Sequence, residues 1–200
     1  MSKLIVSEFV SLNGIMEAPG GEQTHPHTGW TFKSIYGEDH YAYKDTELKE
    51  AESLLLGRKT YEGFAAAWPT RDPSDPFTAR INSMPKYVVS STLTDPEWEN
   101  TTVLEGEPLA AVAKLKEESQ GPILVNGSAQ LVHALAEADI VDEYRAMVHP
   151  VLVADGLRMF PDPGDLKKLK LADAISYDSG VALLIYTCLL YTSPSPRDRS

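Results

Sequence analysis

The hydrophobic positions of the chain fall into short runs that are separated by polar stretches. Typical examples are residues 3–10 (KLIVSEFV) and residues 123–125 (ILV), which are rich in Val, Ile and Leu. Apolar runs of this kind are typical of strands that are buried in a sheet. They predict strands over residues 3–10, 53–56, 86–91, 123–125, 143–153, 170–177 and 181–187.

Helical patterns lie between several of these runs. In one of them, Pro108 stands near a first-turn position, and Leu109 and Val112 fall on one face. Short strands that alternate with amphipathic helices indicate βαβ units, and the last two strands, around residues 178–180, indicate an antiparallel hairpin. The sequence therefore predicts one α/β domain with a mostly parallel sheet. Its helices are expected over residues 41–52, 60–68, 107–118 and 128–138.

Two segments stand apart from this pattern. Residues 11–29 form a long polar loop, and loops longer than about 12 residues in compact domains are usually functional or disordered, so this loop is a candidate binding element. Residues 188–200 (CLLYTSPSPRDRS) switch abruptly to Ser, Pro and Arg and resemble the translated read-through of a sequencing adapter. The alternative is a natural disordered tail. We predict that the domain covers residues 1–187 and that residues 188–200 are non-native or disordered.

Composition and charge exclude several classes of protein. The 200 residues include 18 Lys and Arg, 29 Asp and Glu, and one cysteine, with a net charge of −11. Without residues 188–200, two basic residues and one acidic residue are lost, which leaves 16 basic and 28 acidic residues and a net charge of −12. An acidic chain lacks the basic face that nucleic acid or an anionic membrane requires, and one cysteine excludes an intrachain disulfide. No secretory signal or apolar run of roughly 18 residues is present, so we expect a cytoplasmic protein without nucleic-acid or membrane partners.

Common catalytic motifs are missing from the sequence. There is no G-x-G-x-x-G after the first predicted strand, no Walker A motif around residues 57–60 and no G-x-S-x-G nucleophile elbow. His25 and His27 are a close histidine pair that could begin a metal site. Because no carboxylate or cysteine cluster completes the pair nearby, a solvated pair is the favoured interpretation, and we predict no metal.

Two predicted helix starts have the composition of anion sites. At the first, Gly57 ends a strand and is followed by Arg58, Lys59 and Thr60. Backbone N–H groups and the helix dipole favour a phosphate at such a position, and an arginine can bind it with two hydrogen bonds. The second follows the strand over residues 123–125, where Asn126, Gly127 and Ser128 precede a helix. Each could be an ordinary solvated helix start, but two of them at the carboxyl ends of buried strands are typical of a nucleotide-binding sheet.

These segments occur in the order of a known family. The chain resembles dihydrofolate reductase-like proteins, most closely the stand-alone bacterial dihydrofolate reductase family proteins, which are related to the reductase domain of riboflavin-biosynthesis deaminase-reductases. The resemblance covers essentially residues 1–187, and each motif alone is weak, whereas their order and spacing together are specific. The segments that carry it are residues 11–14, 30–32, 56–62, 64–69, 88–91, 125–128, 141–145, 150–151 and 158–160.

The resemblance implies a dihydrofolate reductase-like fold that binds NADPH, with a central sheet of about eight strands flanked by helices. By position, Arg58 would bind the 2′-phosphate together with Ser90 or Ser91. The resemblance further implies a group of residues around the pyrophosphate, namely Lys59, Thr60, Gly127, Ser128 and Ala129. It also implies that Asn13 and Gly14 lie beside the nicotinamide.

The resemblance also implies a carboxylate that anchors the substrate from the first helix. Asp39 is our candidate for this catalytic role, and Glu38, Asp45 and Glu47 are its competitors. The other interpretation of all four is that they are solvated charges on the surface of a helix. Asn13 stands where close relatives often carry Asp, which removes one candidate proton donor near the nicotinamide.

Two functions follow as expectations. The first is an NADPH-dependent reductase that transfers a hydride to a small heterocyclic substrate, pterin-like or pyrimidine-like. The riboflavin version is weaker, because the H-x-E and P-C-x-x-C segments of a zinc deaminase are missing from the chain. The alternative is an NADP(H)-binding or interaction protein of the same fold without turnover. The resemblance is also compatible with a homodimer.

Overall fold

The computed structural model of the protein describes residues 2–21, 25–33, 38–160 and 164–189. Its strands are β1 (Leu4–Ser11), β2 (Ser53–Gly57), β3 (Lys86–Val89), β4 (Thr101–Val103), β5 (Ile123–Val125), β6 (Glu143–His149), β7 (Leu169–Ser176) and β8 (Ala182–Cys188). Its helices are α1 (Trp30–Lys33), α2 (Tyr41–Glu50), α3 (Arg58–Ala67), α4 (Pro76–Ser83), α5 (Pro108–Glu118) and α6 (Ala129–Glu137), with a 3-10 turn, η1 (Trp68–Thr70).

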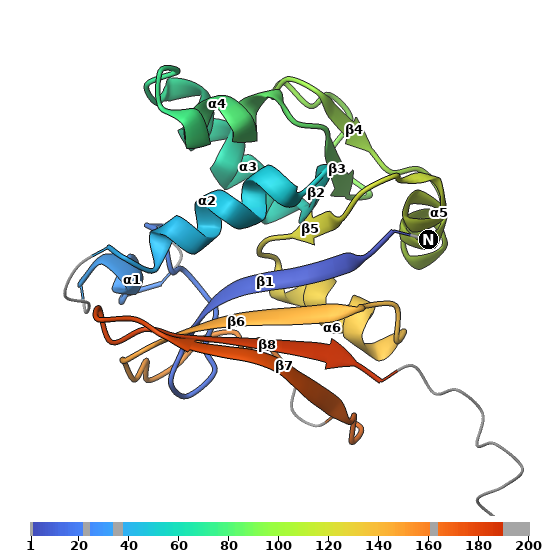
Figure 1. The fold of residues 1–200 in the computed structure, drawn as a ribbon. Helices are drawn as coiled ribbons and strands as arrows, with labels where there is room; N and C mark the ends of the chain where they lie inside the picture. Colours follow the sequence, from blue (N-terminus) through green and yellow to red (C-terminus); the bar gives the residue numbers. More distant parts are fainter. Residues whose placement is uncertain (1, 22–24, 34–37, 161–163, 190–200) are drawn as a thin grey trace, which may run out of the picture.

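In this described part of the chain, eight strands form one sheet in the order β4-β3-β2-β5-β1-β6-β8-β7 (Figure 1). The pairs from β4 through to β6 are parallel, whereas β8 is antiparallel to both β6 and β7. The predicted α/β domain, its mostly parallel sheet of about eight strands and its antiparallel C-terminal hairpin are therefore confirmed.

The helices cover both faces of the sheet. On one face, α2, α3 and α4 pack against β2 and β3 through a core that includes Leu48, Tyr61 and Ile81. On the other face, α5 and α6 pack through Val112 and Leu135 against β1 and β5. β1 lies in the middle of the sheet, so its side chains reach the helices on both faces. Central strands of α/β domains commonly carry functional groups.

Several element boundaries differ from the expected ones. β6 ends at His149 rather than at residue 153, because Pro150 has no N–H to donate to a neighbouring strand. The helix expected from residue 60 begins at Arg58, and the helix expected from residue 128 begins at Ala129. Helix α4 was not predicted, although Asp75 caps it by accepting the backbone N–H of Thr78 at 2.8 Å.

The last strand runs one residue past the predicted end of the domain at residue 187. β8 includes Cys188, the first residue of the segment that we predicted to be a tail, and its N–H donates to the Asp142 carbonyl at 2.9 Å. Residues 190–200 of that segment lie outside the described residues. Within the described residues, no helix combines the length and the apolar character that crossing a membrane requires.

Candidate functional site

The pairing of β1 with β5 ends at the carboxyl half of β1, and this split between the two strands is the opening in the sheet. The β1–β5 ladder contains three pairs and ends where Val6 meets Val125, whereas the β1–β6 ladder continues for seven pairs, to Ser11. Beyond Val125 the backbone ladder stops, and side chains make the contacts between the two segments: Asn126 donates its side-chain amide to the Ser7 carbonyl at 2.8 Å, and the Gly127 N–H donates to the Glu8 carboxyl group at 2.7 Å. The edge of β1 that follows Ser7 is thus not paired with β5. In an open α/β sheet, such a split at the carboxyl ends of strands is the usual position of a ligand.

Two helix N-termini meet next to this opening. The Thr60 hydroxyl, in the first turn of α3, lies 3.0 Å from the hydroxyl of Ser128, which precedes α6. A Cβ atom on Gly57 would collide with the Ser128 side chain, and one on Gly127 would lie 2.6 Å from Thr60 Oγ1. Gly127 also has a φ of +69°, which favours glycine. The structure therefore brings together the predicted pyrophosphate residues of both helices.

The cations at the start of α3 are accessible. Arg58 pairs with Glu62 at 2.8 Å, one turn along the helix, and both side chains are nearly half exposed. Gly57 is paired with Val89 across β2 and β3, so Arg58 and Ser90 leave the sheet at neighbouring positions. Arg58 and Ser90 thus lie on adjacent strands, and their role at a 2′-phosphate stays a prediction.

The other residues predicted near Arg58 and Thr60 fall at the same end of the sheet. Ser90 uses its Oγ atom locally, because it accepts the backbone N–H groups of Thr92 and Leu93 at 3.1 and 2.9 Å. Ser91 and Lys59 are exposed, and Ala129, the first residue of α6, is buried. Lys59 and Ser91 are thus open to a ligand from solvent, whereas the Ser90 oxygen already has two donors.

Asn13 and Gly14 shape the loop that follows β1. The Asn13 side chain donates to the Val153 carbonyl at 2.8 Å and accepts the Val153 N–H at 3.1 Å. Gly14 has a φ of +83°, and the Arg158 guanidinium donates to the neighbouring Asn13 carbonyl at 2.7 Å. These contacts fix the loop against residues 153–159. The Asn13 amide therefore has protein partners on both its nitrogen and its oxygen.

Asp39 lies just before α2 and binds the turn of the β7–β8 hairpin. Its carboxylate accepts backbone N–H groups of Asp178 at 2.7 Å, Ser179 at 3.3 Å and His40 at 3.1 Å. Desolvation acts to raise the pKa of Asp39, but the hydrogen bonds outweigh it and hold the pKa below its ordinary value. These contacts favour a structural role for an ionised Asp39, and its catalytic role stays a prediction.

Glu8 is a buried acid that is not among the predicted site residues. Its side chain is 6% exposed, and its Oε1 accepts the Gly127 N–H at 2.7 Å. Burial raises the pKa of Glu8 to about 8. A signal for this burial exists in the sequence, because Glu8 alternates with Val6 and Val10, which lie on the face of β1 that packs against α5 and α6.

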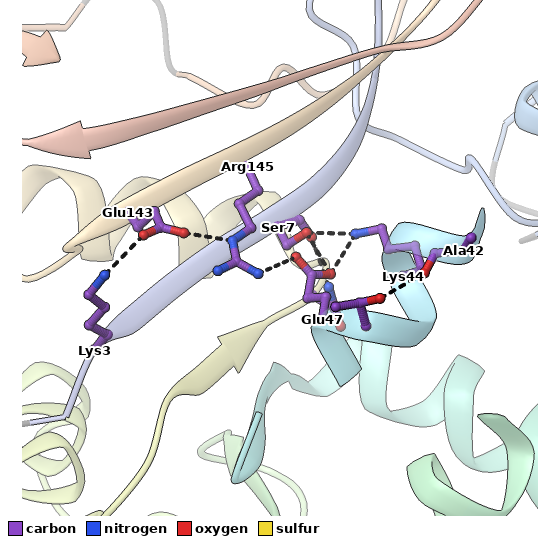
Figure 2. A network of polar contacts seen from close by, with 9 residues as sticks. Lys3, Ser7, Ala42, Lys44, Glu47, Glu143 and Arg145 are labelled. Atoms are coloured by element: carbon purple, nitrogen blue, oxygen red, sulfur yellow. Dashed lines mark hydrogen bonds and ion pairs between the residues drawn. The ribbon is translucent and has the colours of Figure 1, made fainter. Parts of the chain in front are cut away.

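A network of buried charges lies on the opposite face of β1, beneath α2 (Figure 2). Glu47 accepts from Ser7 at 2.9 Å, from Lys44 at 3.0 Å and from Arg145 at 3.2 Å. Lys44 also donates to the Ser7 hydroxyl at 2.6 Å, and Arg145 donates to Glu143 at 2.7 Å. Burial would raise the pKa of Glu47, but these partners outweigh it and lower the pKa below its ordinary value. Glu47, one of the competitors to Asp39, is thus an ionised and buried carboxylate.

Two fully buried histidines adjoin this network at the carboxyl end of β6. The rings of His40 and His149 lie 5.4 Å apart, centroid to centroid, and the Trp30 ring lies 5.4 Å from that of His149. His40 Nε2 and both nitrogens of His149 have no hydrogen-bond partner among the described residues. Burial lowers the pKa of both histidines, that of His149 to about 4, so both rings are neutral at pH 7.

Shallow hollows flank the end of β1. One, of about 240 Å³, is lined by His27, Trp30, Lys33 and residues 151–154, and lies on the side of the buried histidines. A second, of about 200 Å³, is lined by Val10, Gly14, Ala146 and residues 158–160. The hollows and the opening between β1 and β5 lie at the same end of the sheet.

The described residues contain no group of three His, Cys, Asp or Glu side chains placed to hold a metal ion. In the loop, the His25 ring nitrogen Nε2 lies 2.8 Å from the Asp155 carbonyl, and the His25 and His27 rings are 5.6 Å apart. His25 thus joins the loop to residue 155.

Known proteins resemble most of the length of this chain. The family described as "RibD C-terminal domain" matches residues 2–183. The protein YyaP of Bacillus subtilis is 27% identical over 190 residues, which cover 92% of this chain and 94% of that protein. A structure from Shewanella sp. PV-4 that is named for riboflavin biosynthesis has a TM-score of 0.73 and 16% identity, and covers 94% of this chain and 99% of its own. Acinetobacter baumannii RibD has a TM-score of 0.63 and 17% identity, and the match covers 94% of this chain but 58% of that longer one.

Proposed function

The chain belongs to the RibD C-terminal domain family, and from this membership and the geometry of the site we propose that it is an NADPH-dependent reductase. Its substrate would be a small heterocycle, pterin-like or pyrimidine-like. The observation that carries the proposal is the meeting of the α3 and α6 N-termini at Gly57 and Gly127, beside the opening between β1 and β5.

The residues at this end of the sheet fit an anionic dinucleotide. Gly127 carries no side chain where a Cβ atom would reach Thr60, so the two helix starts can lie close together. Helix N-termini favour phosphate groups through their N–H groups and dipoles. Arg58 and Lys59 supply positive charge in a chain that is otherwise acidic. We assign Arg58 to the 2′-phosphate, with Ser91 and Ser90 beside it, and the starts of α3 and α6 to the pyrophosphate.

When bound, NADPH supplies the hydride. The residues of the chain would bind and orient the two reactants and keep water away. On the α2 face of β1, Lys44 lies 4.9 Å from the centre of the Phe9 ring and is held by Glu47. An ammonium group fixed beside an aromatic ring can donate a hydrogen bond to a carbonyl or ring nitrogen of a planar heterocycle. We therefore assign the substrate to this face of β1, with Lys44 as a polar contact.

The alternative is a protein of this fold that binds NADP(H) without turnover. The observation in its favour is that the Asn13 amide, where an acid would be expected, is held on both sides by Val153. Such a side chain can position the loop but cannot donate a proton to a substrate as an acid does.

An NADPH titration followed by a substrate screen tests both candidates. We expect NADPH to quench the tryptophan fluorescence and to raise the thermal midpoint, and we expect absorbance-detected NADPH oxidation with dihydrofolate, biopterins or pyrimidinone intermediates. Binding without oxidation across the panel would favour the alternative. Absence of NADPH binding would contradict both.

A further inference from the structure

Glu8 is a buried acid that has no cation beside it. Within the described part of the chain, its one hydrogen bond is the N–H of Gly127 to Oε1, and no ion pair includes it. The Oε2 atom therefore has no protein partner among those residues. Burial of an ionised carboxylate without a cation is costly, and such groups are usually neutralised by a proton instead.

The charged groups that act on Glu8 across β1 do not remove this cost. From α2, Lys44 favours the ionised form and Glu47 opposes it, and these two are already paired with each other at 3.0 Å. From the β5–α6 segment, the Gly127 N–H favours the ionised form through its hydrogen bond to Oε1, but it carries no full charge. Desolvation is the largest influence and leaves the pKa of Glu8 at about 8. Glu8 is therefore mostly protonated at pH 7.

The position of Glu8 makes its proton relevant to the proposed cofactor. Glu8 lies on β1 two residues beyond the last β1–β5 pair, and it contacts Gly127, at the start of the segment that we assign to the pyrophosphate. An ionised Glu8 would hold a negative charge beside N–H groups that an anion would otherwise bind. The protonated form is uncharged and can donate a hydrogen bond from its O–H group.

Building on the proposed function, we propose that Glu8 is a neutral carboxylic acid in the cofactor site and that NADPH binds to this form alone. When Glu8 is ionised, binding then takes up one proton from the solvent. The proton goes to the Glu8 carboxylate, and no bond in the cofactor changes.

The dependence of NADPH affinity on pH tests the proposal. The apparent dissociation constant of a ligand rises as the binding-competent fraction falls. With half of Glu8 ionised near pH 8, we expect NADPH to bind about tenfold more weakly at pH 9 than at pH 7. The Glu8→Gln variant keeps an oxygen for the Gly127 N–H but cannot ionise, so its affinity should be the same at both pH values. The matched control is Glu118→Gln, an exposed acid on α5, which should behave as the wild type.

A steep pH dependence of the NADPH affinity in the wild type that Glu8→Gln abolishes supports the coupling between NADPH binding and protonation of Glu8. Equal affinity of the wild type at pH 7 and pH 9, or an equally steep dependence in Glu8→Gln, would overturn it. Burial also lowers the pKa of Lys86 to about 8. Because Lys86 is present in the wild type and in Glu8→Gln, a pH dependence that it causes would appear in both proteins.

Two measurements on the wild type remain decisive if Glu8→Gln does not fold. Calorimetry at pH 8 in two buffers of different ionisation enthalpy should show an uptake of about half a proton per bound NADPH. The infrared band of a protonated carboxyl group, measured without cofactor, should be present at pH 7 and absent at pH 10. Absence of that band at pH 7 would refute the protonated Glu8 while leaving the reductase proposal intact. Failure of NADPH to bind at every pH would refute the reductase proposal itself, and the coupling with it.

Discussion

The hydroxyl groups of Thr60 and Ser128 lie 3.0 Å apart and join the first turn of α3 to the start of α6. This contact holds together two helix ends that come from different parts of the sheet. It depends on Gly57 and Gly127, because neither position has room for a Cβ atom. The strength of this junction can be measured through the two glycines.

We expect Gly57→Ala to lower the free energy of unfolding by about 2 kcal/mol, because the added methyl group would overlap the Ser128 side chain. Urea unfolding measures the change. Ser128→Gly in the same chain should restore most of the loss, since it removes the overlapping atoms and Ser128 has a φ of +62° that glycine adopts readily. Additive effects of the two substitutions would show that this overlap is not the cause.

Arg58→Ala should weaken NADPH binding by roughly tenfold to a hundredfold, the range for loss of a hydrogen bond between charged groups. NADH, which lacks the 2′-phosphate, should change by no more than about threefold. Fluorescence titration with both cofactors provides the measurement. Lys114→Ala is the control, because Lys114 is an exposed cation in a similar helical pair. An equal loss for NADPH and NADH would refute the 2′-phosphate role of Arg58.

Glu47→Gln should reduce the free energy of unfolding by about 3 kcal/mol, because it leaves Lys44 and Arg145 buried without their shared anion. The same substitution at Glu118, whose side chain is 65% exposed, should cost less than about 0.5 kcal/mol. Chemical denaturation of both variants at pH 7 makes the comparison. A similar small loss in both would mean that the network in Figure 2 adds little stability.

The buried histidines predict a loss of stability in acid. The pKa of His149 is about 4 in the folded protein and about 6.5 in an unfolded chain, so the unfolded chain binds more protons between these values. The free energy of unfolding should therefore fall as the pH decreases from 6.5 towards 4, by up to roughly 3 kcal/mol from this group. His149→Phe should show a smaller decrease over the same range in urea unfolding at several pH values. Parallel pH profiles for the two proteins would contradict the assignment.

Much of the fold could be predicted from local patterns, because central strands such as β5 are short apolar runs and α6 has a clear apolar face. The edge strand β4 could not, since it is three residues with mixed polarity that become a strand by pairing with β3. In the same way, the sequence indicates a glycine at each helix start but not that Gly57 and Gly127 lie against the opposite helix. Glu47 looks like any solvated helix residue, and its burial results from the placement of α2 over Ser7.

The central position of β1 has a consequence for how the chain folds. Leu4 pairs with Ile123 and Ile5 with Glu143, so the first strand to be synthesised has both of its neighbours far along the chain. During translation β1 remains without strand partners until most of the protein has been made. Closing loops of this length slows folding, and it exposes an apolar strand in the meantime. The centre of the sheet, and with it the cofactor opening, is therefore completed late in the folding of the chain.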